Sequence, residues 1–249
     1  MRRLRYLTHR HRTRSTNVVL GGLLALHAGA INAGGFLVLQ RYTSHMTGFL
    51  AQLGDGLVLQ HWGWAGQALG VVLAFLAGAT VCGALMQWAW HRQLRCVYAL
   101  PLMLEAVLLL PFGLLGSQAS SWSLSLPLIV VLLAFIMGLQ NAVGSAASIG
   151  GLRTTHMTGN VTDVGSDLGR WLYLRAAARR TGTPVPPRGA RMAACATLLV
   201  MFVLGCLLGA WSFSALGFVS VVPLALLLLS LSVPPMLQDL RRLAMARHL

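Results

Sequence analysis

Acidic side chains are scarce in this chain of 249 residues, and lysine is absent. There are 5 Asp and Glu together, and all 19 of the strong positive charges are arginines. Charged residues make up only 10% of the sequence, whereas soluble domains carry about 25%. Hydrophobic residues reach 56%, and the mean hydropathy is +0.70. The shortage of charge excludes a soluble domain and indicates an integral membrane protein.

Catalytic and metal-binding signatures are also missing. The sequence has no CxxC, HExxH or Gly-x-Ser-x-Gly motif and no acidic metal cluster. We therefore expect neither an enzyme nor a bound metal or cofactor. The cysteines, which have no paired spacing, are Cys82, Cys96, Cys195 and Cys206. They are predicted to be packing residues and not disulfide partners.

Six apolar runs are long enough to cross a bilayer, which takes about 20 residues per helix. They cover 18–40, 64–88, 97–116, 126–149, 190–212 and 214–232. The arginines gather in the first tail, the second loop, the fourth loop and the last tail, and the alternate loops hold only Arg41. Because short cytoplasmic loops collect arginine, we expect a multi-pass membrane protein with both termini in the cytoplasm. On this interpretation the positive charge reflects topology and not binding of nucleic acid.

The predicted fold class is therefore an all-α integral membrane protein with six transmembrane helices. The expected parts are a basic cytoplasmic tail at 1–17, a three-helix unit at 18–116, an external loop at 117–125, a second three-helix unit at 126–232, in which 151–189 includes a long cytoplasmic loop, and a cytoplasmic tail at 233–249. A competing interpretation treats the first span as a secretory signal cleaved after Ala30. The repeat described next disfavours cleavage, because it uses that span.

A short polar phrase, Thr-x-His-Met-Thr-Gly, occurs twice, at 43–48 and 154–159. Ahead of it, Gly-x-x-Asn-Ala also occurs twice, at 29–33 and 138–142. The chain is thus two copies of a three-span unit, and an odd number of spans makes the second copy enter the membrane from the opposite side. We expect two inverted three-helix repeats with broken or re-entrant polar segments. For the segment that follows the first phrase, an interfacial helix is the alternative.

The residue types in the phrase suit a helix break inside a membrane. Threonine caps a helix start, glycine allows close approach, and the free amides of a helix start favour an anion or polar solute. Histidine adds a group that changes charge near neutral pH. The expected binding or pathway residues of the two segments are Thr43, His45, Thr47, Gly48, Thr154, His156, Thr158, Gly159, Asn160 and Asp163, with Asn32 and Asn141 ahead of them. The alternative is that both histidines lie at the headgroup interfaces and the glycines serve helix packing.

Glu105 lies near the middle of the third apolar run. A carboxylate at that depth is costly, so it marks a functional site by default. Close to His45 or His156 it would suit proton coupling, and bonded to a neighbouring helix it would be structural. Its counterpart in the second copy is Leu227, so the acid has no repeated partner.

The pairing of "AGAINAGGFLVL" and "TSHMTG" with "MGLQNAVGS" and "RTTHMTGN" resembles the YoaK family of bacterial inner-membrane proteins, a DUF1275-like domain of unknown function. The resemblance covers about residues 18–232 and implies a six-helix inner-membrane protein without naming a substrate. The family often has Asn after the Gly of the phrase. Phe49 stands at that place in the first copy, so only the second copy has the amide, from Asn160.

Three functions follow from these patterns. The leading one is a permease or channel-like protein for a small solute or ion, with a polar site formed by the two phrases. The others are an intramembrane enzyme or metal-binding protein that uses His45 and His156, and a structural membrane protein without transport activity. The expected partners are membrane lipids, including anionic lipid at the arginine-rich tails, and an unknown small solute or ion. No nucleic acid is expected, and a homo-oligomer stays open.

Overall fold

The computed structural model describes residues 13–39, 42–118, 125–147, 156–182 and 189–246. Within these ranges every regular element is a helix. They are α1 (Arg14–Leu39), α2 (Met46–Val58), α3 (Trp62–His91), α4 (Ala99–Ser117), α5 (Ser125–Ala147), α6 (Met157–Thr181), α7 (Ala190–Leu216), the short 3₁₀ helix η2 (Gly217–Ser220) and α8 (Val221–Ala246). The predicted all-α class is confirmed.

Five stretches are long and apolar enough to cross a membrane, where six were expected. They are Ser15–Leu37, Trp62–His91, Ala99–Ser117, Pro127–Ala147 and Ala190–Arg242. The last is 53 residues long because η2 joins α7 to α8 without a polar interruption. Apolar helices of this length satisfy their own backbone groups, as a bilayer requires. These are the helices of a multi-pass membrane protein.

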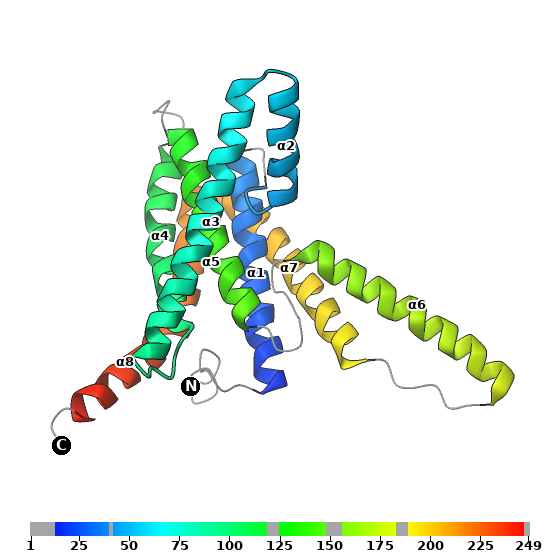
Figure 1. The fold of residues 1–249 in the computed structure, drawn as a ribbon. Coiled ribbons are helices and arrows are strands. Elements are labelled where there is room, and N and C mark those ends of the chain that lie inside the picture. Colours follow the sequence, from blue (N-terminus) through cyan, green and yellow to red (C-terminus); the bar gives the residue numbers. More distant parts are fainter. Residues whose placement is uncertain (1–12, 40–41, 119–124, 148–155, 183–188, 247–249) are drawn as a thin grey trace.

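The long helices form a bundle in which partners in contact lie far apart in sequence (Figure 1). α1 packs against α7, α3 against α5, and α4 against both α8 and α5. Each helix that follows a polar phrase packs against one long helix. α2 contacts α3, and α6 contacts α7. The first turn of α1 and the last turns of α8 lie at the same end of the bundle (Figure 1).

Close contact in two of these pairs depends on glycine. In five places a glycine faces a backbone carbonyl of the partner helix: Gly29 faces Phe202, Gly205 faces Leu26, Gly209 faces Ala30, Gly138 faces Phe75, and Gly78 faces Phe135. A Cβ atom at any of them would collide with that carbonyl. The α1–α7 and α3–α5 pairs therefore pack in the same way, with small residues bringing the backbones together.

The core lies where α1, α4, α5 and α8 meet. Its fully buried side chains include Leu24, Leu102, Phe112, Leu133 and Leu228. In α1, 72% of the apolar stretch is buried inside the protein, whereas in α3 only 17% of it is buried. α1 is thus a central helix and α3 turns most of its apolar surface outward. Cleavage after Ala30 would cut through the middle of this central helix.

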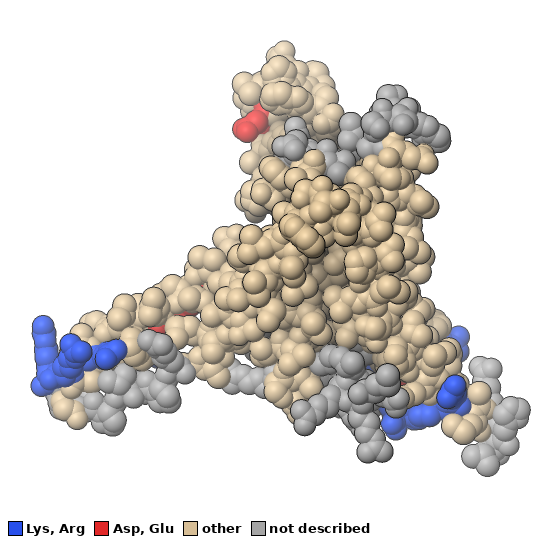
Figure 2. Space-filling view, turned by 180° about the vertical axis from the view of Figure 1, so that it is seen from behind, with Lys and Arg blue, Asp and Glu red and all other residues tan. Residues whose placement is uncertain are grey.

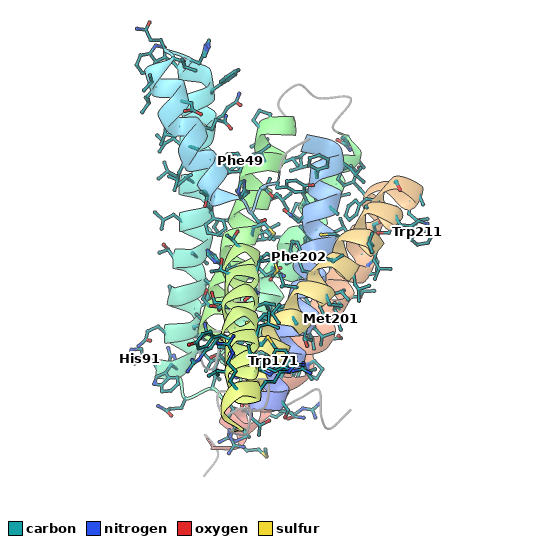
Figure 3. The ribbon with its side chains drawn as sticks, turned by 90° about the vertical axis from the view of Figure 1, so that its right-hand side faces the viewer. Phe49, His91, Trp171, Met201, Phe202 and Trp211 are labelled. Carbon is teal, nitrogen blue, oxygen red and sulfur yellow. The ribbon has the colours of Figure 1, made fainter. Side chains whose placement is uncertain are left out.

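The side chains of α7 are also divided between the interior of the bundle and its outer surface. Phe202 of α7 lies inside the bundle beside α1, whereas Trp211 of the same helix lies on the outer surface (Figure 3). Trp211 is 67% exposed. An apolar ring exposed on a long apolar helix suits contact with lipid.

The segment 151–189, expected to include a long loop, holds a regular helix. α6 occupies Met157–Thr181 and ends at Gly182, whose φ of +67° is the left-handed geometry that favours glycine. The basic side chains gather at the end of the molecule where α6 and α8 finish (Figure 2).

Candidate functional site

Each polar phrase starts a helix with its histidine. His45 precedes α2 with φ −90° and ψ 68°, and His156 precedes α6 with φ −88° and ψ 69°. Each imidazole lies against the first turn of its own helix. A Cβ atom on Gly48 would be 2.6 Å from Nδ1 of His45, and one on Gly159 would be 2.9 Å from Nδ1 of His156. The glycine three residues after the histidine therefore makes room for the ring, which explains the spacing of the phrase.

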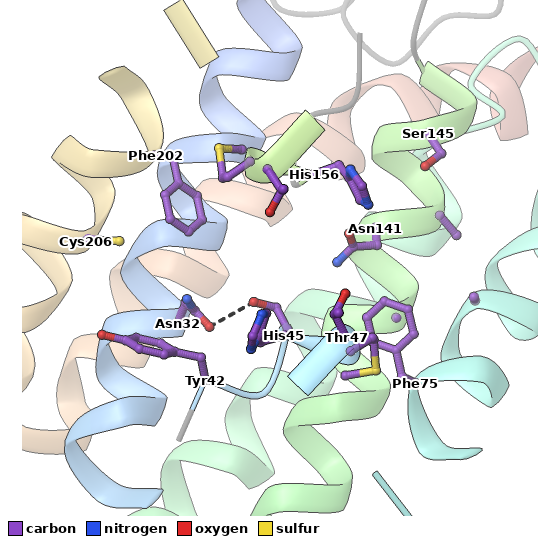
Figure 4. A pocket seen from close by; sticks show the side chains of 17 residues that line it. Asn32, Tyr42, His45, Thr47, Phe75, Asn141, Ser145, His156, Phe202 and Cys206 are labelled. Carbon is purple, nitrogen blue, oxygen red and sulfur yellow. Dashed lines mark hydrogen bonds between the residues drawn. The ribbon is translucent and has the colours of Figure 1, made fainter. Parts of the chain in front are cut away.

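The two phrases meet at one cavity of about 710 Å³. Figure 4 shows His45 and His156 facing the same space from the starts of α2 and α6. The wall contains matched positions of the two sequence copies: Asn32 and Asn141, His45 and His156, Met46 and Met157, and Thr47 and Thr158. The shared cavity brings together residues that are more than a hundred positions apart in the chain.

Side chains of α3 and α7 complete the wall of the cavity. Phe75 and Ala79 come from α3, and Phe202 and Cys206 come from α7. Each phenylalanine precedes a packing glycine by three residues, and Ala79 and Cys206 directly follow those glycines. The contacts that bring α3 onto α5 and α7 onto α1 thus also orient the cavity wall.

Hydrogen bonds and ring stacking fix parts of this wall. Ser44 donates from Oγ to Oδ1 of Asn32 over 3.0 Å (Figure 4). Asn141 donates from Nδ2 to the carbonyl of Met137 over 2.7 Å. Tyr42 stacks on Phe36 of α1, with ring centroids 4.5 Å apart. These contacts hold hydroxyl and amide groups at the edge of the cavity.

The chemistry of the wall is polar but carries no fixed charge. Imidazole, amide and hydroxyl groups alternate with aromatic rings and thioethers, and the described lining residues include no Asp, Glu, Arg or Lys. The starts of α2 and α6 lie at the wall, and a helix start carries partial positive charge from its free amides. The cavity therefore favours a ligand with hydrogen-bond acceptors.

A third histidine shows that this backbone geometry is not unique to the cavity. His61 precedes α3 with φ −87° and ψ 70°, which matches His45 and His156. It is exposed, and its ring lies tilted against that of Trp64, with a centroid distance of 4.8 Å. His61 does not line the cavity, so position, and not the helix-start geometry, distinguishes the two histidines of the phrases.

The other predicted site residues lie around the cavity and do not line it. Thr43 is buried, and its Oγ1 has no hydrogen-bond partner among the described residues. Gly48 borders a smaller hollow of about 230 Å³ that shares Tyr42 and His45 with the main cavity. Gly159 and the buried Asn160 lie in the first turn of α6. Thr154 is outside the described residues.

Two acidic candidates have partners elsewhere. Asp163 pairs with Arg191, with Oδ2 and Nη2 2.8 Å apart, and so joins α6 to α7. Glu105 is fully buried in the core, where its Oε1 lies 3.5 Å from Nδ1 of His27. The partner of Glu105 is thus a histidine of α1 and neither histidine of the phrases.

Several lining residues were missed by reasoning from sequence. Phe75 and Phe202 begin a Phe-x-x-Gly pattern that occurs at 75–78, 135–138 and 202–205, and Ala79 and Cys206 directly follow its glycine. That pattern is a usable signal, but it occurs within continuous apolar runs, where it looks like ordinary packing. His27 was missed because it has no counterpart in the second copy.

A family model described as "Protein of unknown function (DUF1275)" matches residues 20–233. The match includes all the described residues that line the cavity and confirms the resemblance to a DUF1275-like domain. No curated protein and no solved structure matches the chain significantly. Since the matched region covers most of its length, the chain belongs to the DUF1275 family.

Proposed function

We propose that the protein is a permease for small polar solutes and that the cavity between the two phrases is its binding site. One observation carries this proposal. His45 and His156, each with the following Met and Thr, line the same cavity although they come from different copies of the repeat. Packing of helices against each other does not require titratable rings at matched places on one cavity.

The cavity also suggests the class of solute. Its volume of about 710 Å³ lies within the range of about 300–1,000 Å³ found for small-molecule sites. Its hydrogen-bond donors and the two helix starts favour an anion or a neutral solute rich in oxygen. A free metal cation would lack carboxylate ligands among the described lining residues.

The proposed topology has six crossings in two inverted repeats. The matched glycine contacts of α1 with α7 and of α3 with α5 support an inverted relationship between the halves. Counting α7 and α8 as separate crossings gives three in each half. The end that collects the basic side chains (Figure 2) is then the cytoplasmic side of a bacterial inner membrane. A site at the interface of inverted repeats suits alternating access, in which one repeat rocks against the other.

Uptake into proteoliposomes tests the proposal. Purified protein is reconstituted, and uptake of radiolabelled lactate, acetate, phosphate, sulfate and glycerol is compared with that of protein-free liposomes. We expect at least one solute to enter faster with protein, and we expect His45→Ala with His156→Ala to lower that rate at least tenfold.

His61→Ala is the matched control, because it removes the same side chain from the same helix-start geometry outside the cavity. We expect it to keep wild-type uptake. Equal uptake by the double variant and by His61→Ala would contradict the assignment of the cavity as the binding site.

A further inference from the structure

A second polar cluster lies in the core, separate from the cavity. His27 of α1, Glu105 of α4 and Gln140 of α5 are all 0% exposed. Nδ1 of His27 is 2.8 Å from Nε2 of Gln140 and 3.5 Å from Oε1 of Glu105. Three helices thus direct three polar side chains, two of them titratable, at one point.

The hydrogen bonds of this cluster do not include the carboxyl group of Glu105. Gln140 donates from Nε2 to the carbonyl of Leu24 over 3.3 Å and lies close to the imidazole. Both oxygens of Glu105 lack a hydrogen-bond partner among the described residues. A bare carboxylate in such a place is very unfavourable, because burial removes its hydration without replacing it.

A single proton resolves this arrangement. An amide nitrogen only donates, so Nδ1 of a neutral His27 accepts from Gln140. Glu105 then lies beside the imidazole as a neutral carboxylic acid. Loss of this proton leaves a net negative charge in the core, and gain of a second proton leaves a net positive charge, so the closed core retains one proton.

The cluster is connected to the cavity through two helices. In α5, Gln140 faces the core, and the next residue, Asn141, lines the cavity. In α1, His27 is in the core cluster, and Asn32 lines the cavity just over one turn later. α1 and α5 also contact each other. A shift of either helix that opens the cavity would therefore change the surroundings of the buried pair.

The cluster occurs once, unlike the cavity residues. The position matched to Glu105 is Leu227, and those matched to His27 and Gln140 are Ile136 and Ile31. Of the titratable groups on neighbouring helices, Cys82 of α3 interacts electrostatically with Glu105. Asp239 of α8 binds backbone amides at the α3–α4 connection instead. One copy of the cluster implies one proton per protein molecule.

We propose that His27 and Glu105 form a buried one-proton site that couples solute movement through the cavity to proton movement. The coupling rests on the proposed permease function, whereas the proton site itself does not. In the step, the O–H bond of the Glu105 carboxylic acid breaks when the core opens to water on one side, and water accepts the proton. The bond forms again when water on the other side returns a proton to the carboxylate.

Infrared spectroscopy tests the proton site without any solute. The C=O stretch of a protonated carboxylic acid is measured in reconstituted membranes near neutral pH. We expect a band in the wild type that Glu105→Gln lacks and that the control Asp55→Asn keeps, because Asp55 is exposed at the far end of α2. Glu105→Asp, which retains the acid, should restore a shifted band. A wild type without the band, or with a band that Glu105→Gln leaves unchanged, would overturn the proton site.

Uptake under an imposed pH gradient tests the coupling, with whichever of the five radiolabelled solutes the wild type carries. One proton per solute allows about tenfold more accumulation for each pH unit of gradient. We expect the wild type and Asp55→Asn to respond to the gradient and Glu105→Gln not to respond.

Uptake that depends on His45 and His156 but ignores the gradient in the wild type would overturn the coupling and leave the permease function intact. Failure of all five solutes to enter would count against the permease function and the coupling together. The infrared band would still decide the proton site.

Discussion

Gly48 and Gly159 offer the sharpest test of how the polar phrases work, because a methyl group at either position would displace the histidine without harming the helix. A Cβ atom on Gly48 would lie 2.6 Å from Nδ1 of His45, and ordinary contact begins at 3.4 Å. The ring must therefore move by about 0.8 Å, the difference of the two distances. At Gly159 the starting distance is 2.9 Å, and the required shift is about 0.5 Å.

The two effects of the substitution have opposite directions. Alanine stabilises a helix relative to glycine by about 0.5–1 kcal/mol, so the melting temperature should stay the same or rise. A misplacement of about 1 Å in a binding group costs up to about a hundredfold in rate. We expect Gly48→Ala to lower uptake roughly tenfold and Gly159→Ala to lower it less.

Gly54 and Gly165 provide matched controls, since they lie in α2 and α6 and a Cβ atom there meets nothing within 4 Å. Their alanine variants should gain the same helix stability and keep wild-type uptake. The assay is initial uptake into proteoliposomes together with thermal unfolding of the same samples. If Gly48→Ala transports as well as Gly54→Ala does, the position of the His45 ring is not important and the reasoning is refuted.

Two further predictions concern the frame around the site. Asp239 accepts two backbone amides of the α3–α4 connection, at 2.7 Å and 2.9 Å, so Asp239→Asn should lower the free energy of unfolding by about 1.5–3 kcal/mol. The pKa of the Cys96 thiol is raised to about 12, mainly by burial and in addition by Asp239. Asp239→Asn should therefore lower this pKa and speed alkylation of Cys96 at pH 8. An unchanged alkylation rate would argue against the contact. Gly29→Ala and Gly138→Ala should each lower the melting temperature by several degrees because the methyl group meets a partner carbonyl, whereas Gly70→Ala, which faces open space, should not.

The sequence was sufficient to predict the local features of the site. The duplicated phrase indicates His45 and His156, and the odd number of spans per copy predicts that the second copy enters the membrane from the opposite side. The cavity that they share depends on tertiary contacts, in particular the glycine contacts of α1 with α7 and of α3 with α5. Such contacts join residues of helices that are not neighbours in the chain, and no local pattern reports which helices will pair.

Glu105 illustrates where the prediction stopped. Its depth in an apolar run marked it as unusual, but its partner could not be inferred. His27 lies in the first apolar run, has no repeated counterpart, and meets Glu105 only because α1, α4 and α5 converge. The packing of α6 against α7 is also a tertiary contact, which the composition of 151–189 does not report.

The most direct test of the shared cavity uses Cys206, which lines it from α7. Cys82, Cys96 and Cys195 are buried and are replaced by alanine, so that a membrane-impermeant maleimide reports Cys206 alone. An alternating-access cavity predicts labelling from the outer side in right-side-out vesicles and from the inner side in inside-out vesicles, and slower labelling from both sides after Thr47→Trp or Thr158→Trp fills the space. Labelling from neither side, or labelling that both tryptophan variants leave unchanged, would contradict a solute pathway through the two polar phrases.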